Sequence, residues 1–105
     1  MPNKQRDKGH RYERQLCNEF KALGFTKCCT SRAESKRRDD EKVDLMFTEP
    51  YNVQAKAYDS NQPNFRKVLE EMPIEENTNV VFHKVGRKKD IVVMWKDDFY
   101  KLIKK

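Results

Sequence analysis

The stretch of sequence that decides the fold is VDLMFTEPYNVQAKA, residues 43–57. Apolar residues alternate with polar ones in each half, and Thr48, Glu49 and Pro50 separate the halves. Alternation with a period of two predicts a strand with one buried face, and a short segment with proline predicts a turn. We therefore predict an antiparallel hairpin in which residues 43–47 pair with residues 51–57.

One face of this predicted hairpin is polar. Asp44 lies on it in the first strand, and Gln54 and Lys56 lie on it in the second. A three-residue turn pairs Phe47 with Tyr51. This register places Asp44 directly across from Gln54, with Cβ atoms about 4.5–5.5 Å apart. A slip of one residue would send these side chains to different faces, so the register is a sharp test of the prediction.

Upstream of the hairpin, the pattern predicts a helix and a short strand. Residues 8–23 carry an apolar stripe at helical spacing, and Gly24 stands where a helix commonly ends. Residues 26–31 have the composition of a strand. The charged residues 32–42 follow, and we expect them to form a flexible, exposed loop.

Downstream, we expect a helix that opens at residues 61–63 and ends at Pro73. Strands over residues 79–84 and 90–95 come next. A last helix, capped by Asp97, is expected to bury three apolar side chains: Phe99, Leu102 and Ile103. The predicted fold class is α/β (α+β), a single mixed β-sheet flanked by helices in the order α-β-β-β-α-β-β-α.

Length and composition narrow the function. With 105 residues the chain is expected to form a single domain over residues 1–105, with residues 1–7 as a flexible arm. It has no apolar run of the length of a membrane helix or a signal peptide, so we expect an intracellular, cytoplasmic protein. The three cysteines form no disulfide framework, which suits a reducing compartment. The net charge of +6 is typical of a protein that binds a polyanion.

A second carboxylate adds to the polar face of the hairpin. Glu13 shares a helical row with Leu16, Cys17 and Phe20, so it lies at the edge of the buried face of the first helix. A carboxylate there is costly unless it is paired or binds a metal. If the helix packs on the sheet, Glu13 comes close to Asp44. The alternative is an ordinary ion pair of Glu13 and a solvated strand face.

Together these groups predict a site for metal-assisted phosphodiester hydrolysis. Two carboxylates and the amide oxygen of Gln54 are hard oxygen ligands, which suit Mg²⁺. Lys56 can neutralise charge on a phosphate or orient a water. Phosphate contacts of such a chain would come from basic residues of the first helix and of the loop: Lys8, Arg11, Arg14, Arg32, Lys36, Arg37 and Arg38. The alternative for the loop is a solvated charged surface.

The chain also resembles a known family, the archaeal and phage type Holliday junction resolvases of the PD-(D/E)xK nuclease superfamily. The matching segments are KGHRYERQL (8–16), LGF (23–25), SR (31–32), VDL (43–45) and VQAKA (53–57). The resemblance implies a restriction-endonuclease-like core, with Glu13 and Asp44 as metal ligands and Lys56 as the catalytic lysine. There are three departures: Gln54 replaces the family's second acid, Val43 replaces a proline, and residues 30–35 replace a Gly-Ser-Gly loop. Ser31, Arg32 and Ser35 are candidates for the family's phosphate-contacting role.

The predicted function is therefore a Mg²⁺-dependent endodeoxyribonuclease that resolves four-way DNA junctions, with Mn²⁺ able to replace Mg²⁺. A junction has near two-fold symmetry, so we expect a homodimer. Two alternatives stay open. One is another nuclease or nickase of the same superfamily. The other is a non-catalytic DNA-binding homologue, because Gln54 carries one negative charge fewer than the usual acid.

Overall fold

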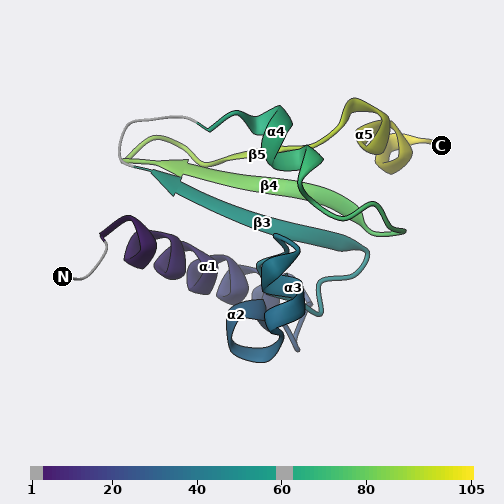
Figure 1. Ribbon diagram of the computed structural model, residues 1–105. Coiled ribbons are helices and arrows are strands. Elements are labelled where there is room, and N and C mark those ends of the chain that lie inside the picture. Colours follow the sequence, from purple (N-terminus) through teal and green to yellow (C-terminus); the bar gives the residue numbers. More distant parts are fainter. Residues whose placement is uncertain (1–3, 59–62) are drawn as a thin grey trace.

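The computed structural model describes residues 4–58 and 63–105 (Figure 1). In this part of the chain the elements are α1 (Lys4–Ala22), β1 (Cys29–Thr30), α2 (Ser31–Glu34), α3 (Lys36–Asp40), β2 (Leu45–Met46), β3 (Tyr51–Tyr58), α4 (Phe65–Glu70), β4 (Thr78–Val85), β5 (Ile91–Val93) and α5 (Lys96–Ile103). This mixture of helices and strands confirms the predicted class. The predicted order lacks two helices, α2 and α3, and the strands form two hydrogen-bonded sheets instead of one.

Helix α1 is amphipathic and packs along β3. Its buried side chains follow the predicted stripe: Tyr12, Leu16, Cys17 and Phe20. They pack in one cluster with Val53, Ala55 and Ala57 of β3. Apolar residues that recur at i and i+4 fall on one side of a helix, and this side finds its partner on the sheet.

The C-terminal end of α1 lies where we predicted it, whereas the N-terminal end does not. Gly24 has a φ of 113°, which is the left-handed conformation expected just past a helix. The helix begins at Lys4 and not at residue 8, so residues 4–7 of the expected arm are helical. Residues 1–3 of that arm lie outside the described residues.

Strands β3, β4 and β5 form a three-stranded mixed sheet. β3 and β4 are parallel, with Gln54 beside Val81, and β5 is antiparallel to β4 at the edge. Parallel neighbours need a crossover, and α4 lies within it. Since side chains alternate along β3, Gln54 and Lys56 lie on the face opposite α1. On that face Val81 packs with Val68 and the rest of the α4 cluster.

The predicted pairing of the hairpin is wrong. β2 pairs with β1, as Cys29 faces Met46, while β3 pairs with β4. The chain does reverse at the predicted turn, where the Tyr51 N–H donates to the Thr48 carbonyl at 2.9 Å. In a regular antiparallel ladder beyond this turn, the N–H of Ala55 would donate to a main-chain carbonyl of the preceding strand. It donates to the carboxylate of Asp44 instead, and the residues before the turn form no regular ladder with β3.

Residues 32–42 are not a flexible loop, which corrects the prediction. Most of them lie in α2 and α3. The hydroxyl of Ser35 accepts from the Arg38 N–H at 3.3 Å and caps α3. Opposite charges recur four residues apart, as in the pair of Lys36 and Asp40 at 3.8 Å. Such spacing supports a helix, and the charge run of the sequence concealed it.

The second helix and the second strand pair are close to their predicted positions. α4 has Asn64 as its N-cap, and its Oδ1 accepts from the Lys67 N–H at 3.2 Å. The part of this prediction that falls on residues 61–62 lies outside the described residues. β4 and β5 pair antiparallel as expected, with His83 beside Ile91.

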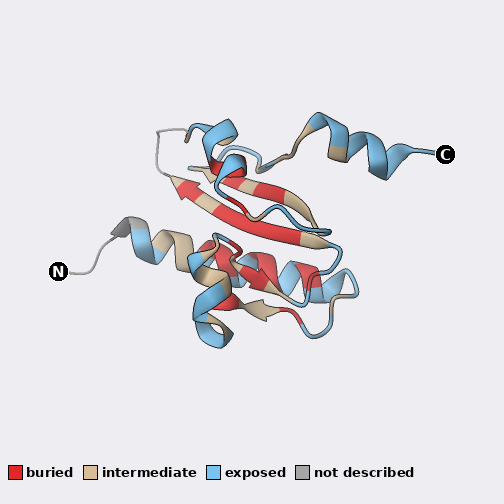
Figure 2. Cartoon of the chain, turned by 45° about the vertical axis from the view of Figure 1, so that its right-hand side comes forward, coloured by how far each residue is buried: buried red, intermediate tan, exposed pale blue. Residues whose placement is uncertain are grey.

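The prediction for α5 is wrong about burial. Phe99, Leu102 and Ile103 are 47%, 48% and 54% exposed. Figure 2 shows α5 extending away from the body of the chain, with mostly exposed residues. Its N-cap is Trp95 rather than Asp97. Periodicity predicts an apolar stripe correctly, but whether another element covers that stripe depends on the tertiary structure.

Candidate functional site

Asp44 lies at the free edge of β3. Its main-chain N–H donates to the carbonyl of Val53 at 2.7 Å, and its carboxylate Oδ2 accepts from the N–H of Ala55 at 2.8 Å. These two bonds go to the residues on either side of Gln54. Asp44 therefore lies beside the predicted partner, although through its side chain and not through a strand ladder.

Burial raises the pKa of Asp44 to about 6. The N–H of Ala55 opposes this shift, and so do the charges of Lys56 and Lys42, while the carboxylate of Asp39 adds to it. A desolvated carboxylate that keeps a raised pKa beside cations is poorly compensated by the protein alone. It is a place where an added cation would be stabilised.

Glu13 supplies the second carboxylate from α1. Its residue is 9% exposed, and its Oε1 is buried without a hydrogen-bond partner. The Arg32 Nε lies 3.6 Å from this oxygen, which makes an ion pair that is too long for a hydrogen bond. Burial and the nearby charge of Asp44 raise the pKa of Glu13 to about 7, against the effect of Arg32. The charge of Asp44 thus acts on Glu13, so the two carboxylates lie near each other, as we predicted from the sequence.

Gln54 and Lys56 are placed differently from the two acids. Both lie on the face of β3 opposite α1, where Gln54 stands beside Val81. The Oε1 of Gln54 is buried without a hydrogen-bond partner. Lys56 is half-buried and near enough to Asp44 to stabilise its charge. Asp44 at the strand edge is therefore the residue that connects Glu13 on one side with Lys56 on the other.

The donor chemistry of this group fits a hard divalent cation. Glu13 and Asp44 offer carboxylate oxygens, and the unpartnered oxygens of Glu13 and Gln54 are acceptors that lack a donor. Among the residues that the structure describes, no three His, Cys, Asp or Glu side chains form a metal-binding group. Two carboxylates, those of Glu13 and Asp44, suit a Mg²⁺ ion that keeps several of its water ligands.

Two serines proposed for phosphate contact serve the local fold. Ser31 is fully buried, and its hydroxyl donates to the carbonyl of Val43. Ser35 caps α3. The Ser31 hydroxyl thus joins the start of α2 to the residues before β2, and the Ser35 hydroxyl joins the N-cap of α3 to its first turn.

The basic residues of α2 and α3 are mostly paired with acids. Arg32 pairs with Glu13, and Arg37 lies 3.7 Å from Glu41. Lys36 and Arg37 are largely exposed, so their pairs with neighbouring acids are weak and open easily to a phosphate.

Arg38 has a structural role that the sequence did not reveal. Its guanidinium donates to Glu75 at 2.9 Å, and the same carboxylate oxygen accepts from the Asn52 side chain at 2.8 Å. These hydrogen bonds hold the pKa of Glu75 below its usual range. Arg38 and Glu75 are far apart in sequence, and no local pattern connects them.

Three basic residues of α1 were predicted to contact phosphate: Lys8, Arg11 and Arg14. Lys8 and Arg11 line a cavity between α1 and the ends of β3 and β4. Arg11 and Arg14 line a second, shallower surface with Asp7 and His10. The charges of Asp39 and Lys42 also act on Asp44. The sequence marks Asp39, with Asp40 and Glu41, as an acid that interrupts the basic run and is a candidate for an extra metal ligand or a turn cap, whereas nothing in the pattern singled out Lys42.

Comparison with known proteins gives no match to a protein-family model, to a curated protein or to a solved structure. The described residues contain no helix that is both long and apolar enough to span a membrane.

Proposed function

We propose that this chain is a metal-dependent, structure-specific endodeoxyribonuclease that resolves four-way DNA junctions by phosphodiester hydrolysis. The observation that carries the proposal is the pair of buried carboxylates, Glu13 and Asp44, each with a raised pKa. Perturbed carboxyl groups that influence each other are typical of catalytic and metal sites. A basic chain with a net charge of +6 adds the electrostatic attraction to DNA.

Each residue of the site has a role in this proposal. Glu13 and Asp44 hold the cation, and the bond from Ala55 fixes the orientation of the Asp44 carboxylate. Lys56 stabilises negative charge on the scissile phosphate. Bound Mg²⁺ supplies a Lewis acid and a water of lowered pKa. Arg32 pairs with Glu13 and is partly exposed, so with a cation held by the two acids its guanidinium would be available to a phosphate.

A non-catalytic DNA-binding protein is the second candidate. The placement of Gln54 favours it, because this side chain faces away from α1 and replaces a carboxylate with a neutral amide. With two acids and not three, the affinity for Mg²⁺ is expected to be low. DNA binding through the basic residues would survive the loss of the metal site.

The proposal includes a homodimer. Two matched cuts across a near two-fold junction call for a two-fold protein. Exposed apolar side chains of β5 and α5 offer a surface for a second copy: Ile91, Val92, Phe99, Leu102 and Ile103. Light scattering at increasing concentration tests this part, with Leu102→Glu expected to shift the mass toward the monomer.

The decisive experiment compares cleavage of a four-way junction, a flap and a linear duplex, each with Mg²⁺ and with EDTA. Cleavage of the junction with Mg²⁺ alone supports the proposal, and preference for the flap or duplex indicates another nuclease. Binding of DNA without cleavage of any substrate indicates the non-catalytic protein. Asp44→Asn is the test variant, and Asp97→Asn is the matched control, because Asp97 is an exposed aspartate of α5.

A further inference from the structure

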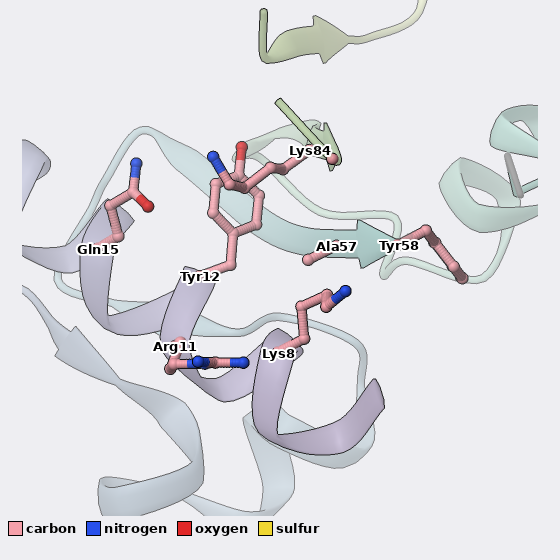
Figure 3. A pocket seen from close by; sticks show the side chains of 8 residues that line it. Lys8, Arg11, Tyr12, Gln15, Ala57, Tyr58 and Lys84 are labelled. Carbon is pink, nitrogen blue, oxygen red and sulfur yellow. The ribbon is translucent and has the colours of Figure 1, made fainter. Parts of the chain in front are cut away.

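Most of the net positive charge of the chain lies at the carboxyl ends of β3 and β4. Residues 6–14 of α1 and residues 84–90, at the end of β4 and in the turn to β5, contain eight Lys and Arg side chains and three acidic ones. These two segments, which we call the basic end, therefore carry an excess of five of the net charge of +6. They lie close together, because both line one cavity: Figure 3 shows Lys8 and Arg11 of α1 and Lys84 of β4 around it.

The α2–α3 segment has no such excess of charge. Residues 31–44 contain five basic and five acidic side chains, so their net charge is zero. Four of the five basic side chains pair with acids, as Arg38 does with Glu75 at 2.9 Å. Since a polyanion is attracted over a distance by net charge, the basic end attracts it more strongly than the α2–α3 segment does.

The turn between β4 and β5 presents exposed cations from an anchored backbone. The Gly86 N–H donates to the carbonyl of Tyr58 at 3.2 Å, which ties the start of the turn to the end of β3. The one acid of this segment is Asp90, and it pairs with Lys84 at 3.7 Å. Three exposed cations of the turn have no ion pair among the described residues: Arg87, Lys88 and Lys89.

The α1 side of the basic end is positive as well. Arg11 and Arg14 are exposed and have no ion pair among the described residues. Burial and then the charges of neighbouring arginines lower the pKa of His10, against the effect of Asp7. A histidine whose charged form is opposed by several nearby cations indicates a positive potential at this surface.

The side chains of the basic end favour the backbone of a duplex over a single strand or a protein. Single strands are bound largely by stacking of their bases on aromatic rings, and protein interfaces have an apolar centre. Among the described residues, no large apolar or aromatic side chain of the basic end is exposed. Tyr58 lines the cavity, but its ring lies against His83, with the two centroids 6.0 Å apart, on the other face of the sheet. Lys and Arg without such partners are the typical contacts of phosphate groups.

We propose that the basic end binds the sugar–phosphate backbone of duplex DNA, through the three cations of the turn and through Arg11 and Arg14. The choice of DNA rests on the proposed function, but binding here needs neither the metal nor the two carboxylates. Glu13 belongs to the same turn of α1 as Arg11 and Arg14, so a duplex bound at the basic end lies close to the proposed cleavage site.

The test is the salt dependence of binding to a 20-base-pair duplex, measured by fluorescence anisotropy in EDTA. The test variant combines Arg87→Gln with Lys88→Gln. Each lost phosphate contact reduces the log–log salt slope by about 0.9, so we expect a reduction of about two units and at least roughly tenfold weaker binding at 0.1 M salt. A second variant, Arg11→Gln with Arg14→Gln, is expected to reduce the slope by a similar amount.

The matched control combines Lys104→Gln with Lys105→Gln. It removes the same two charges from exposed side chains, and Figure 1 shows the C-terminal end of α5 at the opposite end of the chain from the turn between β4 and β5. We expect this control to change the slope by less than about 0.5 unit. All the changed side chains are exposed, so the core is not disturbed, and circular dichroism verifies the fold of each variant.

Four results would overturn the proposal. An equal reduction of the slope by the turn variant and by the control would mean attraction by overall charge alone. An unchanged slope for the turn variant would exclude the turn from the interface. A single strand of the same length that binds as tightly as the duplex would indicate a different binding mode. Failure of the folded protein to bind the duplex even at 50 mM salt would point to another class of partner, such as an acidic protein.

Cleavage assays separate this proposal from the proposed function. If the unchanged protein cleaves no junction but the turn variant has the reduced slope, duplex binding at the basic end stands and the nuclease proposal fails. If the unchanged protein cleaves the junction and the turn variant binds and cleaves with the same salt dependence, only binding at the basic end is refuted.

Discussion

Replacing Glu13 with glutamine is expected to stabilise the metal-free protein at pH 8. Burial and the charge of Asp44 raise the pKa of Glu13 from 4.5 to about 7. At about 1.36 kcal/mol per pKa unit, this rise corresponds to roughly 3 kcal/mol. Glutamine keeps the shape of the side chain but never ionises, so the variant escapes this cost and loses only the weak pair with Arg32.

The direction of the pH dependence follows from linkage. A carboxyl with a higher pKa in the folded chain stabilises the fold in its protonated form. That contribution is fully present below pH 4.5 and is lost as the pH rises through about 7. The difference between Glu13→Gln and the unchanged protein is therefore expected to be small at pH 4 and to grow to roughly 2–3 kcal/mol at pH 8.

The assay is urea denaturation in EDTA at pH 4, 6 and 8, followed by the fluorescence of Trp95, which is the chain's one tryptophan. Glu19→Gln is the control, because Glu19 is an exposed acid of the same helix. We expect it to change the free energy of unfolding by less than about 0.5 kcal/mol at each pH. Mg²⁺ at ten times its dissociation constant is expected to add about 1.4 kcal/mol to the unchanged protein at pH 8, and much less to Glu13→Gln.

One result would refute the reasoning. If Glu13→Gln destabilises the protein by the same amount at all three pH values, Glu13 is held by its pair with Arg32. In that case it is not an uncompensated carboxylate, and the main support for a metal at this site is gone.

Further predictions concern the site and its surroundings. Asp44→Asn is expected to reduce cleavage more than a hundredfold while junction binding, by electrophoretic mobility shift, changes less than threefold; equal loss of both would mean that Asp44 only holds the fold. Gln54→Glu adds an anionic oxygen, so we expect cleavage at lower Mg²⁺ concentration, and loss of cleavage would count against a contact with the metal. Arg38→Ala removes the hydrogen-bonded ion pair with Glu75, which keeps its bond from Asn52, and is expected to cost about 1 kcal/mol of stability by urea denaturation; no change would mean that the ion pair is not formed in solution. Changing Lys36 and Arg37 together to Ala is expected to reduce the log–log salt slope of DNA binding by roughly two units, measured by fluorescence anisotropy, and an unchanged slope would exclude them from the interface.

The local sequence pattern predicted the helices and strands that are defined by the spacing of their own apolar residues. The row of Tyr12, Leu16 and Phe20 identified α1 and its buried side, because a period of 3.6 residues leaves one side of a helix apolar. The same reasoning located β3 and placed Gln54 and Lys56 on one face of it. The proximity of Glu13 and Asp44 also followed from sequence, since an acid next to a buried stripe is expected near the strand on which that stripe packs.

Only the tertiary structure decided which strands pair and which helices are covered. The amino-acid order contains no sign that the Asp44 carboxylate takes the N–H of Ala55, because one side-chain bond of about 1 kcal/mol competes there with a ladder of similar bonds. The link from Arg38 to Glu75 crosses from α3 to the segment after α4, and only chain folding brings these charges together. The apolar stripe of α5 was legible, but its exposure depends on whether any other surface reaches it. Periodicity is a property of neighbours along the chain, whereas pairing and coverage are free-energy differences between alternative partners far apart in it.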